Sequence, residues 1–249
     1  MFKKIGFFHF GINHHNPIGS LRAEVSAINN EEDIRNSLIV LPEGFNVGKF
    51  YKDAGACDYN PTCLSQLAEI SAQFNMVFIV GLIINHANLF RKPYSSGYLI
   101  DGSYTKLICH KAGDDGTQNY VPCPSNCDVH NPIRYKKACI AILICMDVED
   151  HPRCQALMNR VDSTDSDLKI VCITSCMHAG YFSGGQFGSN LISEEWKNKN
   201  IILANANAKD YSGCNSFLTN RSGEIIASFP STRRKDHNKI VLRSVESVV

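Results

Sequence analysis

The sequence lacks the features that mark several large classes of protein. Its 25 Lys and Arg residues are balanced by 24 Asp and Glu residues, so no excess of positive charge is present to attract nucleic acid. No run of about 18 apolar residues occurs, which argues against a membrane-spanning helix. The chain has no low-complexity segment and no linker rich in Pro, Gly or Ser. Since 44% of its 249 residues are hydrophobic, a disordered chain is also excluded.

Motifs for cofactors are missing as well. The sequence contains no phosphate-binding loop and no dinucleotide fingerprint, so we expect no nucleotide cofactor. The cysteine pairs at 57 and 63 and at 123 and 127 are spaced more widely than the CxxC pairs of structural zinc sites. No second matching pair completes a set of four ligands. We therefore expect the protein to work with neither a cofactor nor a metal.

Cysteine, in contrast, is abundant, with 11 residues. The first apolar stretch of the chain is interrupted by His9 and is too short for the core of a secretory signal, so we expect a cytoplasmic protein. In that reducing compartment cysteines stay as thiols, and they act as buried side chains, metal ligands or nucleophiles. Because Cys139, Cys172 and Cys176 lie within apolar runs, we expect them to be small buried residues.

Short apolar runs alternate with amphipathic stretches along the chain. This alternation, followed by late hairpins, predicts a single α/β domain over residues 1–249, with two similar halves packed sheet to sheet. The predicted strands are 5–10, 37–41, 76–84, 97–100, 106–110, 137–146, 169–174, 201–205, 216–219, 224–228 and 239–243, and the predicted helices cover 20–35, 62–74, 152–161 and 194–199.

Three reactive residue types stand at the ends of predicted strands. Glu43 follows the strand at 37–41, Lys111 follows the strand at 106–110, and Cys145 follows the apolar part of a third strand. Open α/β sheets bind ligands beyond the carboxyl ends of their strands. Taken singly, each residue type is more often solvated or packed than catalytic. Together they supply a base, a cation and a nucleophile.

The sequence around these residues resembles the nitrilase superfamily of carbon–nitrogen hydrolases. Leu-Pro-Glu at 41–43, Cys-His-Lys at 109–111 and Ile-Cys-Met-Asp at 144–147 are similar to the motifs that carry the Glu-Lys-Cys triad of that family. Further on, the segment 201–207 is similar to a family strand that ends in Asn, and the segment 213–227 is similar to the G-x-S hairpin and its G-E-I-L-A turn. The order of all these motifs also agrees with the family.

The resemblance implies a four-layer αββα sandwich of two mixed sheets, with Glu43, Lys111 and Cys145 as the catalytic triad. In such a site Glu43 takes the thiol proton and later activates water. Lys111 stabilises the oxyanion together with the backbone N–H of Met146. Attack by Cys145 produces a thioester. We also expect the strand-to-helix turn at Cys145 to expose the sulfur and to place it at a helix N-terminus.

Residues close to the triad are expected to contact substrate. Phe45 follows Glu43 by two positions, and Glu149 follows Cys145 by four, while Asp150 is expected to cap the next helix. His178 stands at the end of another predicted strand and opens a loop with several glycines. The expected substrate contacts are Phe45, Met146, Glu149, His178 and Tyr181.

The match to the family is uneven at two points. Lys106 lies in an aromatic-x-Lys pattern that the family also shows, so it is the alternative to Lys111 as the catalytic lysine. The spacing to Cys145 favours Lys111. The family often has a second Glu between the Lys and the Cys, but no Glu occurs here from residue 112 to residue 144. The candidates for its place are Asp114, Asp115 and Asp128, and the alternative is that the role is missing from this protein.

We therefore predict a hydrolase that cleaves a non-peptide C–N bond in a small-molecule amide, carbamoyl amide or nitrile. One alternative is a catalytically weakened relative that kept the fold as a small-molecule-binding or interaction module. Another is a papain-like enzyme that pairs Cys145 with His178, although the local signature of that family is missing. The resemblance also implies a homodimer or a higher homo-oligomer. We expect no nucleic-acid partner and no membrane partner.

Overall fold

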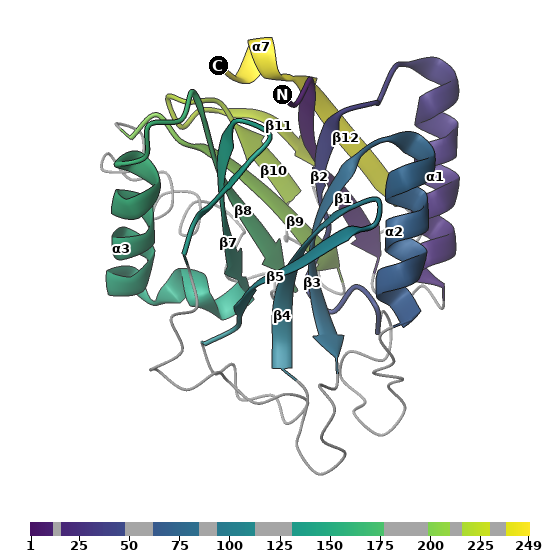
Figure 1. Ribbon diagram of the computed structural model, residues 1–249, viewed down its shortest axis with the longest axis horizontal. Helices are drawn as coiled ribbons and strands as arrows, with labels where there is room; N and C mark the ends of the chain where they lie inside the picture. Colours follow the sequence, from purple (N-terminus) through teal and green to yellow (C-terminus); the bar gives the residue numbers. More distant parts are fainter. Residues whose placement is uncertain are drawn as a thin grey trace.

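Two β-sheets packed face to face form the centre of the protein, and helices cover their outer faces (Figure 1). The computed structural model describes most of the chain, including all the sheet strands named below. The described residues are 1–11, 16–47, 62–84, 94–112, 131–176, 199–209, 216–229 and 238–249.

The first sheet has six strands in the order β12-β1-β2-β3-β4-β5. Strands β1, β2 and β3 run parallel, and β4, β5 and β12 join them in antiparallel pairs. Their bounds are Lys4–Gly11 for β1, Ser37–Val40 for β2, Val77–Ile84 for β3, Tyr94–Asp101 for β4, Tyr104–His110 for β5 and Lys239–Ser244 for β12.

The second sheet has six strands in the order β6-β7-β8-β9-β10-β11. Strands β7, β8 and β9 run parallel, and the other three are antiparallel to their neighbours. The ends of β1 and β9 pair with each other and so join the two sheets. The bounds are Ile133–Tyr135 for β6, Ala138–Ile144 for β7, Leu168–Ser175 for β8, Ile202–Lys209 for β9, Ser216–Thr219 for β10 and Ile225–Phe229 for β11.

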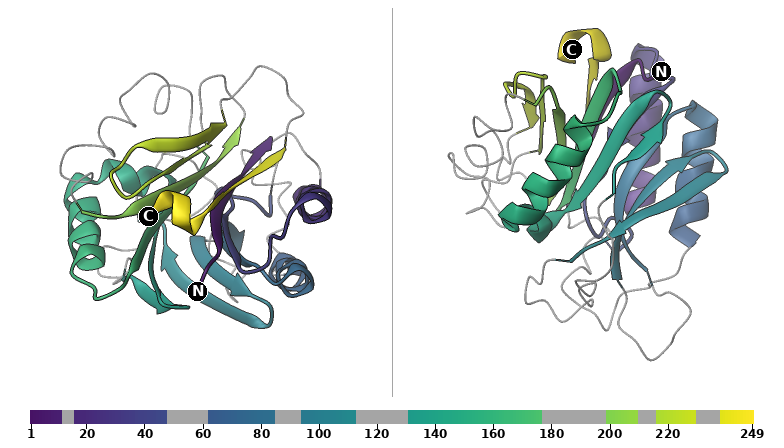
Figure 2. Two further views of the ribbon diagram at one scale, coloured as in Figure 1. Left: turned by 90° about the horizontal axis from the view of Figure 1, so that it is seen from above. Right: turned by 60° about the vertical axis from the view of Figure 1, so that its left-hand side comes forward.

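Helices complete the four layers of the sandwich (Figure 2). Helix α1 (Pro17–Glu31) and helix α2 (Thr62–Phe74) pack on the first sheet, and helix α3 (His151–Asp162) packs on the second. Two short elements follow strands, the 3₁₀ helix η2 (Cys145–Glu149) after β7 and α7 (Val245–Val248) after β12. This arrangement confirms the predicted αββα architecture.

Strand β3 shows why the sandwich forms. All eight of its residues, Val-Phe-Ile-Val-Gly-Leu-Ile-Ile, are buried. A strand that is apolar on both faces must be covered on both faces. One face of β3 therefore packs against α1 and α2 through Phe78, Val80 and their neighbours, while Val77 and Ile79 belong to the core between the two sheets.

The two sheets approach closely at a pair of glycines. Gly81 of β3 pairs with Gly97 of β4. A Cβ atom at Gly81 would lie 2.7 Å from the Oγ1 atom of Thr174 in β8, and one at Gly97 would lie 3.0 Å from the side chain of Ile142 in β7. Since real Cβ contacts are longer than this, the missing side chains let the sheets come together. The same Cβ atom at Gly81 would lie 2.9 Å from the Cα atom of Glu43.

Most of the predicted elements are confirmed, with shifts at their ends. Helix α1 begins at Pro17 rather than at residue 20, because the side chain of Asn16 accepts a hydrogen bond from the backbone of Gly19 at 2.8 Å and caps the helix. Strand β7 ends at Ile144, where η2 begins. Two short elements, β6 and α7, are absent from the predicted set. The predicted helix at 194–199 lies almost entirely outside the described residues.

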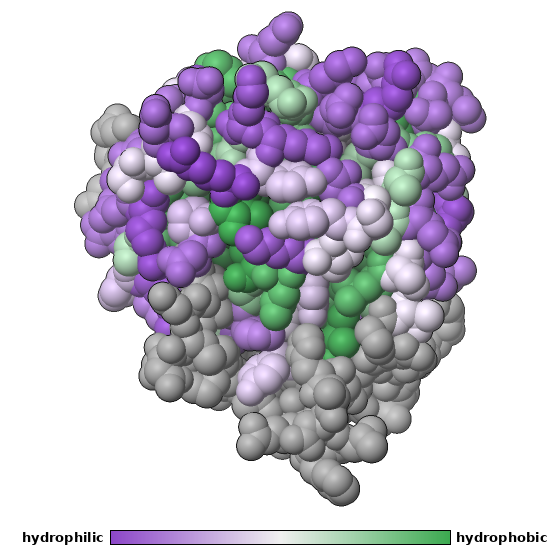
Figure 3. Space-filling model, in the orientation of Figure 1, coloured by the Kyte–Doolittle hydropathy of each residue, from purple (hydrophilic) through white to green (hydrophobic). Residues whose placement is uncertain are grey.

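Hydrophilic and apolar side chains are distributed unevenly over the surface. Hydrophilic side chains cover the upper part of the face seen in Figure 3, and apolar side chains show mainly near its centre. Leu107, on the edge strand β5, is among the more exposed large apolar residues, at 40%. None of the helices in the described part of the chain is both long enough and apolar enough to cross a membrane.

Candidate active site

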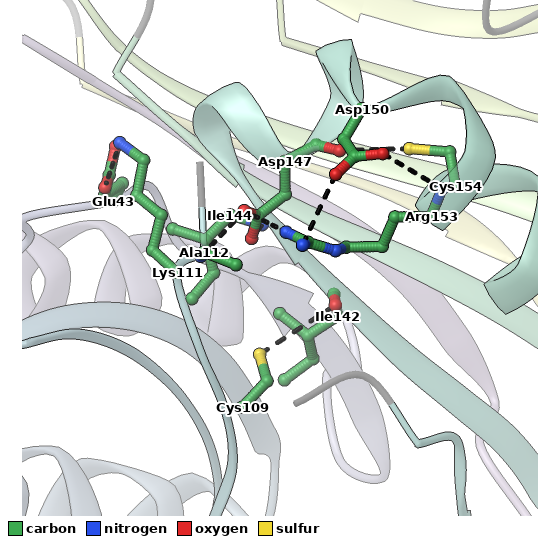
Figure 4. A network of polar contacts seen from close by, with 10 residues as sticks. All are labelled: Glu43, Cys109, Lys111, Ala112, Ile142, Ile144, Asp147, Asp150, Arg153 and Cys154. Carbon is green, nitrogen blue, oxygen red and sulfur yellow. Dashed lines mark hydrogen bonds and ion pairs between the residues drawn. The ribbon is translucent and has the colours of Figure 1, made fainter. Parts of the chain in front are cut away.

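The three residues expected to form a triad come from three separate strand ends. Glu43 lies three residues beyond β2, Lys111 follows β5 directly, and Cys145 follows β7 directly. The Nζ atom of Lys111 lies 3.0 Å from the Oε1 atom of Glu43, and both side chains are completely buried (Figure 4). The strands thus bring a carboxylate and an ammonium group, 68 positions apart in sequence, into one buried ion pair.

Ser95 of β4 contacts both members of this pair. Its hydroxyl group donates a hydrogen bond of 2.8 Å to Glu43 Oε1, the same oxygen that Lys111 reaches. Its backbone carbonyl accepts a hydrogen bond of 2.8 Å from the backbone N–H of Lys111. Ser95 itself has no exposed surface. One buried residue therefore holds the side chain of Glu43 and the main chain of Lys111.

Cys145 adopts a backbone conformation that is rare for residues with a side chain. Its φ angle is +47°, at the point where β7 turns into η2. Non-glycine residues with a positive φ occur frequently at functional sites, where the surrounding structure holds them. The strain is thus stored at the residue that the sequence identifies as the nucleophile.

The surroundings of Cys145 favour the neutral form of its thiol. Burial of the side chain raises its pKa far above the usual value, and the negative charge of Glu43 raises it further. Lys111 and a hydrogen bond from the backbone of Cys176 act in the opposite direction but are weaker. The residue is only 3% exposed, so the expectation that the turn exposes the sulfur is wrong. The side chain of Glu43 acts on the thiol through its charge and through a hydrogen bond, and both effects raise the pKa of Cys145.

Asp147 joins the segments that carry Lys111 and Cys145. Its Oδ1 atom accepts a hydrogen bond of 2.9 Å from the backbone N–H of Ala112, and its Oδ2 atom accepts one of 3.2 Å from the backbone N–H of Ile144. The side chain is fully buried, and Arg153 approaches it to 3.9 Å (Figure 4). No role was predicted for this residue, although it is the Asp of the Ile-Cys-Met-Asp motif.

Comparison with known proteins identifies solved structures that share this architecture. No protein-family model matches the sequence, and no curated protein matches it. Solved structures match over nearly the whole chain. An amidase of the nitrilase superfamily from Nesterenkonia AN1 matches with a TM-score of 0.71 at 13% identity, over 98% of this chain and 90% of that chain. The fold is that of the nitrilase superfamily.

Two further structures with the nitrilase fold show the same likeness. The CN-hydrolase superfamily protein XC1258 from Xanthomonas campestris matches with a TM-score of 0.73 at 13% identity, over 99% of this chain and 92% of that chain. Nit3 from Saccharomyces cerevisiae matches with a TM-score of 0.71 at 14% identity, over 99% and 92%. At this level of identity the likeness establishes the fold, and the chemistry has to be argued from the residues of the site.

Within this nitrilase fold the two candidate lysines have different surroundings. Lys106 lies on the exposed part of β5, opposite Leu99 of β4. Lys111 is buried beside Glu43.

Asp150 caps α3 as expected, because its side chain accepts a hydrogen bond of 3.1 Å from the backbone N–H of Arg153.

The residues expected to contact substrate are only partly described. The ring of Phe45 is 1% exposed and packs against Phe8 and Phe10, with ring centroids 6.0 and 5.3 Å away. Phe45 is thus a core residue, and a role as a pocket wall remains a prediction. Met146 and Glu149 belong to η2, but their side chains lie outside the described part. The other predicted residues outside the described ranges are Asp114, Asp115, Asp128, His178 and Tyr181.

The described residues can be compared with the ligand sets that hold metal ions. No group of three or more His, Cys, Asp or Glu side chains among them is arranged to hold a metal ion. The charges that surround Cys145 in the described part come from Glu43 and Lys111. What these residues can do together is move a proton and stabilise a negative oxygen atom.

Proposed function

We propose that the protein is a carbon–nitrogen hydrolase that uses Cys145 as a nucleophile and forms a thioester with the acyl group of a small molecule. The observation that carries this proposal is the buried Glu43–Lys111 ion pair, both of whose charges act on the Cys145 thiol. A buried ion pair costs free energy of desolvation and is weak evidence for a purely stabilising role. Its position beside a strained cysteine suggests chemistry instead.

The first half of the reaction begins with a neutral thiol. As the sulfur attacks the carbonyl carbon, its proton passes to the carboxylate of Glu43, so that no free thiolate has to form in the buried site. The carbonyl oxygen becomes negative, and the ammonium group of Lys111 is the positive charge available to stabilise it. The C–N bond then breaks, the proton on Glu43 passes to the leaving nitrogen, and a thioester remains on Cys145.

The second half of the reaction regenerates the enzyme. Glu43 is again a carboxylate and takes a proton from a water molecule, whose oxygen attacks the thioester carbon. Lys111 stabilises the second oxyanion in the same manner. When the C–S bond breaks, the sulfur recovers its proton from Glu43, and a carboxylic acid is released. Each step uses Glu43 as the single proton carrier, which suits a carboxylate whose charge acts directly on the thiol.

Among the possible substrates we favour small amides and carbamoyl amides over nitriles. In one solved structure, a mutant of the Nesterenkonia amidase carries the acetamide moiety of fluoroacetamide on its active-site cysteine. In another, a double mutant of that amidase is in complex with acrylamide. Those findings belong to the amidase. They support the proposal because its chain shares the fold of this one.

A second candidate function is a non-catalytic module that binds a small molecule in the same site. The 3% exposure of Cys145 and its raised pKa favour this candidate, because both reduce the reactivity of the thiol toward electrophiles in solution. The buried Glu43–Lys111 pair favours the hydrolase. The two candidates differ in one measurable product, which is ammonia.

The deciding experiment is a panel of small amides, carbamoyl amides and nitriles assayed for ammonia release. Wild type is compared with Cys145→Ala and with Cys172→Ala, a matched control that removes another buried thiol, within β8. We expect Cys145→Ala to abolish turnover and Cys172→Ala to retain it. Mass spectrometry with a slow substrate should show an acyl adduct on Cys145. An adduct on a different cysteine, together with an active Cys145→Ala variant, contradicts the proposal.

Location and assembly are part of the same proposal. The seven cysteines in the described residues are thiols that form no disulfide, which supports a reducing, cytoplasmic location. We propose a homodimer or a higher homo-oligomer by analogy with proteins of this fold. Light scattering of the purified protein measures its mass directly, and a value equal to the 27.7 kDa of one chain would contradict the oligomer.

A further inference from the structure

Among the buried serines in the described part of the chain, Ser95 is the one whose hydroxyl donates to a carboxylate. Ser37 donates to the backbone carbonyl of Ile34, and Ser71 donates to that of Met76, so both satisfy themselves within five positions of the chain. Ser95 donates instead to the carboxylate of Glu43, 52 positions away and in a different strand end. Ser175 and Ser216 also contact distant residues, but through amide and imidazole groups rather than a carboxylate.

The hydroxyl contact acts on the charge of Glu43. A serine hydroxyl has one proton to donate, and Ser95 gives it to Oε1, where the ammonium group of Lys111 also donates. Donors directed at a carboxylate favour its charged form over its protonated form. The described residues bring two titratable groups to Glu43, namely Lys111 from β5 and Cys145 from η2. Ser95 is the neutral donor that adds to the effect of Lys111.

The carbonyl contact acts on the position of Lys111. The ladder between β4 and β5 pairs Ser96 with His110, the last residue of β5. The hydrogen bond from the N–H of Lys111 to the carbonyl of Ser95 extends this ladder by one step beyond the strand. The start of the Lys111 side chain is therefore fixed relative to the residue that also holds Glu43.

We propose that Ser95 is a positioning residue for the reaction, which holds the carboxylate of Glu43 oriented to receive the proton of Cys145. This inference rests on the proposed function, since it assigns Ser95 a task in the same proton transfer. The consequence is specific: without the Ser95 hydroxyl, the proton transfer from Cys145 to Glu43 is impaired, and the pH at which activity is lost on the acidic side changes. A residue with only a packing role would leave that pH unchanged.

The experiment measures kcat/KM against pH for wild type, Ser95→Ala and Ser95→Thr. For Ser95→Ala we expect kcat/KM at neutral pH to fall about 10- to 100-fold, the range for a lost hydrogen bond to a charged group. We expect its acidic limb to move upward by about one pH unit. Ser95→Thr keeps the hydroxyl and should restore the position of the limb.

The matched control is Ser96→Ala. Ser96 is the next residue of the same strand and is equally buried, but its hydroxyl lies 2.7 Å from the ring of His110. We expect its pH profile to match that of wild type. Thermal unfolding of every variant separates packing from positioning. If Ser95→Ala loses activity only in proportion to stability and keeps the wild-type acidic limb, Ser95 is a packing residue and the proposal is wrong.

A second readout separates this proposal from the proposed function. The rate at which chloroacetamide, a small amide-like electrophile, alkylates Cys145 is followed by mass spectrometry as a function of pH. This rate needs no turnover, so it tests Ser95 even if the substrate panel releases no ammonia. We expect an acidic limb that disappears in Glu43→Gln and moves upward in Ser95→Ala. Identical limbs in wild type and Ser95→Ala would overturn the role of Ser95.

Discussion

Asp147 accepts hydrogen bonds from the backbone N–H groups of Ala112 and Ile144, at 2.9 and 3.2 Å. Ala112 is the residue after Lys111, and Ile144 is the residue before Cys145. One buried carboxylate thus ties together the two chain segments that carry the cation and the nucleophile. The distance between Lys111 and Cys145 depends on this connection as well as on the sheets.

We predict that Asp147→Asn weakens both the fold and the reaction. An amide offers only one acceptor oxygen, so one of the two backbone N–H groups loses its partner and is left buried. The expected cost is about 1 to 3 kcal/mol in the free energy of unfolding, measured with urea. We also expect kcat/KM to fall, because Lys111 and Cys145 are no longer held together.

The control for this prediction is Asp150→Asn. Asp150 caps α3, and Asn caps helices about as well as Asp does. Both carboxylates also approach Arg153, so both variants lose that contact. We expect Asp150→Asn to behave nearly as wild type. Equal effects of the two variants would indicate that the loss of the arginine contact, and not the tie across the site, explains the result.

A pair of lysine variants tests the assignment of the cation. Lys111→Met leaves the carboxylate of Glu43 buried without its ion-pair partner, which costs about 3 to 5 kcal/mol for pairs of this kind. We expect it to abolish ammonia release and to lower the urea midpoint. Lys106→Met changes an exposed residue on β5 and should leave both properties intact. An inactive Lys106→Met variant would contradict the assignment of Lys111 as the cation of the site.

Gly81 is predicted to be indispensable for the geometry of Glu43. A Cβ atom at this position would lie 2.9 Å from the Cα atom of Glu43 and 2.7 Å from the Oγ1 atom of Thr174. The backbone atom cannot swing aside as a side chain can. We expect Gly81→Ala to cost about 1 to 3 kcal/mol of stability, the usual range for overpacking, and to displace Glu43.

A double variant separates the two contacts of Gly81. Thr174→Ala removes the hydroxyl group from β8 but leaves the contact with Glu43 in place. The Gly81→Ala, Thr174→Ala protein should therefore regain part of the unfolding free energy without regaining turnover. If turnover returns together with stability, the displacement of Glu43 is not the cause of the loss.

The buried thiols predict how stability depends on pH. Burial raises the pKa of Cys172, as it does that of Cys145, so in the folded protein these thiols keep their protons. In the unfolded chain they ionise near the ordinary pKa of 9.0. Unfolding then releases protons, and the stability that is present below pH 9 is lost as the pH rises above it.

We expect each such thiol to contribute a slope of about 1.4 kcal/mol per pH unit above that point. Urea unfolding at pH 8, 9 and 10 measures the slope in wild type and in Cys172→Ala. The variant lacks one of the buried thiols, and its stability should decline less steeply. Parallel profiles would show that Cys172 ionises equally in the folded and the unfolded chain.

Much of the fold could be predicted because its signals are local. The continuous apolar run of β3 indicates a strand covered on both faces, and the turn at 220–223 indicates the hairpin of β10 and β11. Strand β6 was missed because it has only three residues, one of them Arg. The turn that follows it places Lys136 and Lys137 at positive φ, where Asn or Gly would have signalled a hairpin.

The residue types of the site could be predicted from the sequence, but their contacts and their burial could not. Glu43 and Cys145 follow apolar strands, and this pattern identifies them. The choice between Lys106 and Lys111 depends on which lysine the ladder between β4 and β5 carries to Glu43, which no local pattern encodes. Ser95 acts through contacts between strand ends of the first sheet, and Asp147 acts through a contact between the two sheets. The burial of the Cys145 thiol likewise depends on tertiary packing.

The order of the strands and helices and the three reactive residue types at strand ends can be predicted from local patterns, because hydrophobic periodicity and turn residues act over a few neighbours. The entry of Lys111 into the buried pair, the enclosure of Cys145 and the hydrogen bond from Ser95 to Glu43 arise only when the chain folds. These properties depend on burial and on charges brought together from positions up to 68 residues apart. The strand order of the first sheet brings Glu43, Ser95 and Lys111 together, and the paired glycines of β3 and β4 let the second sheet, which carries Cys145, pack closely against it.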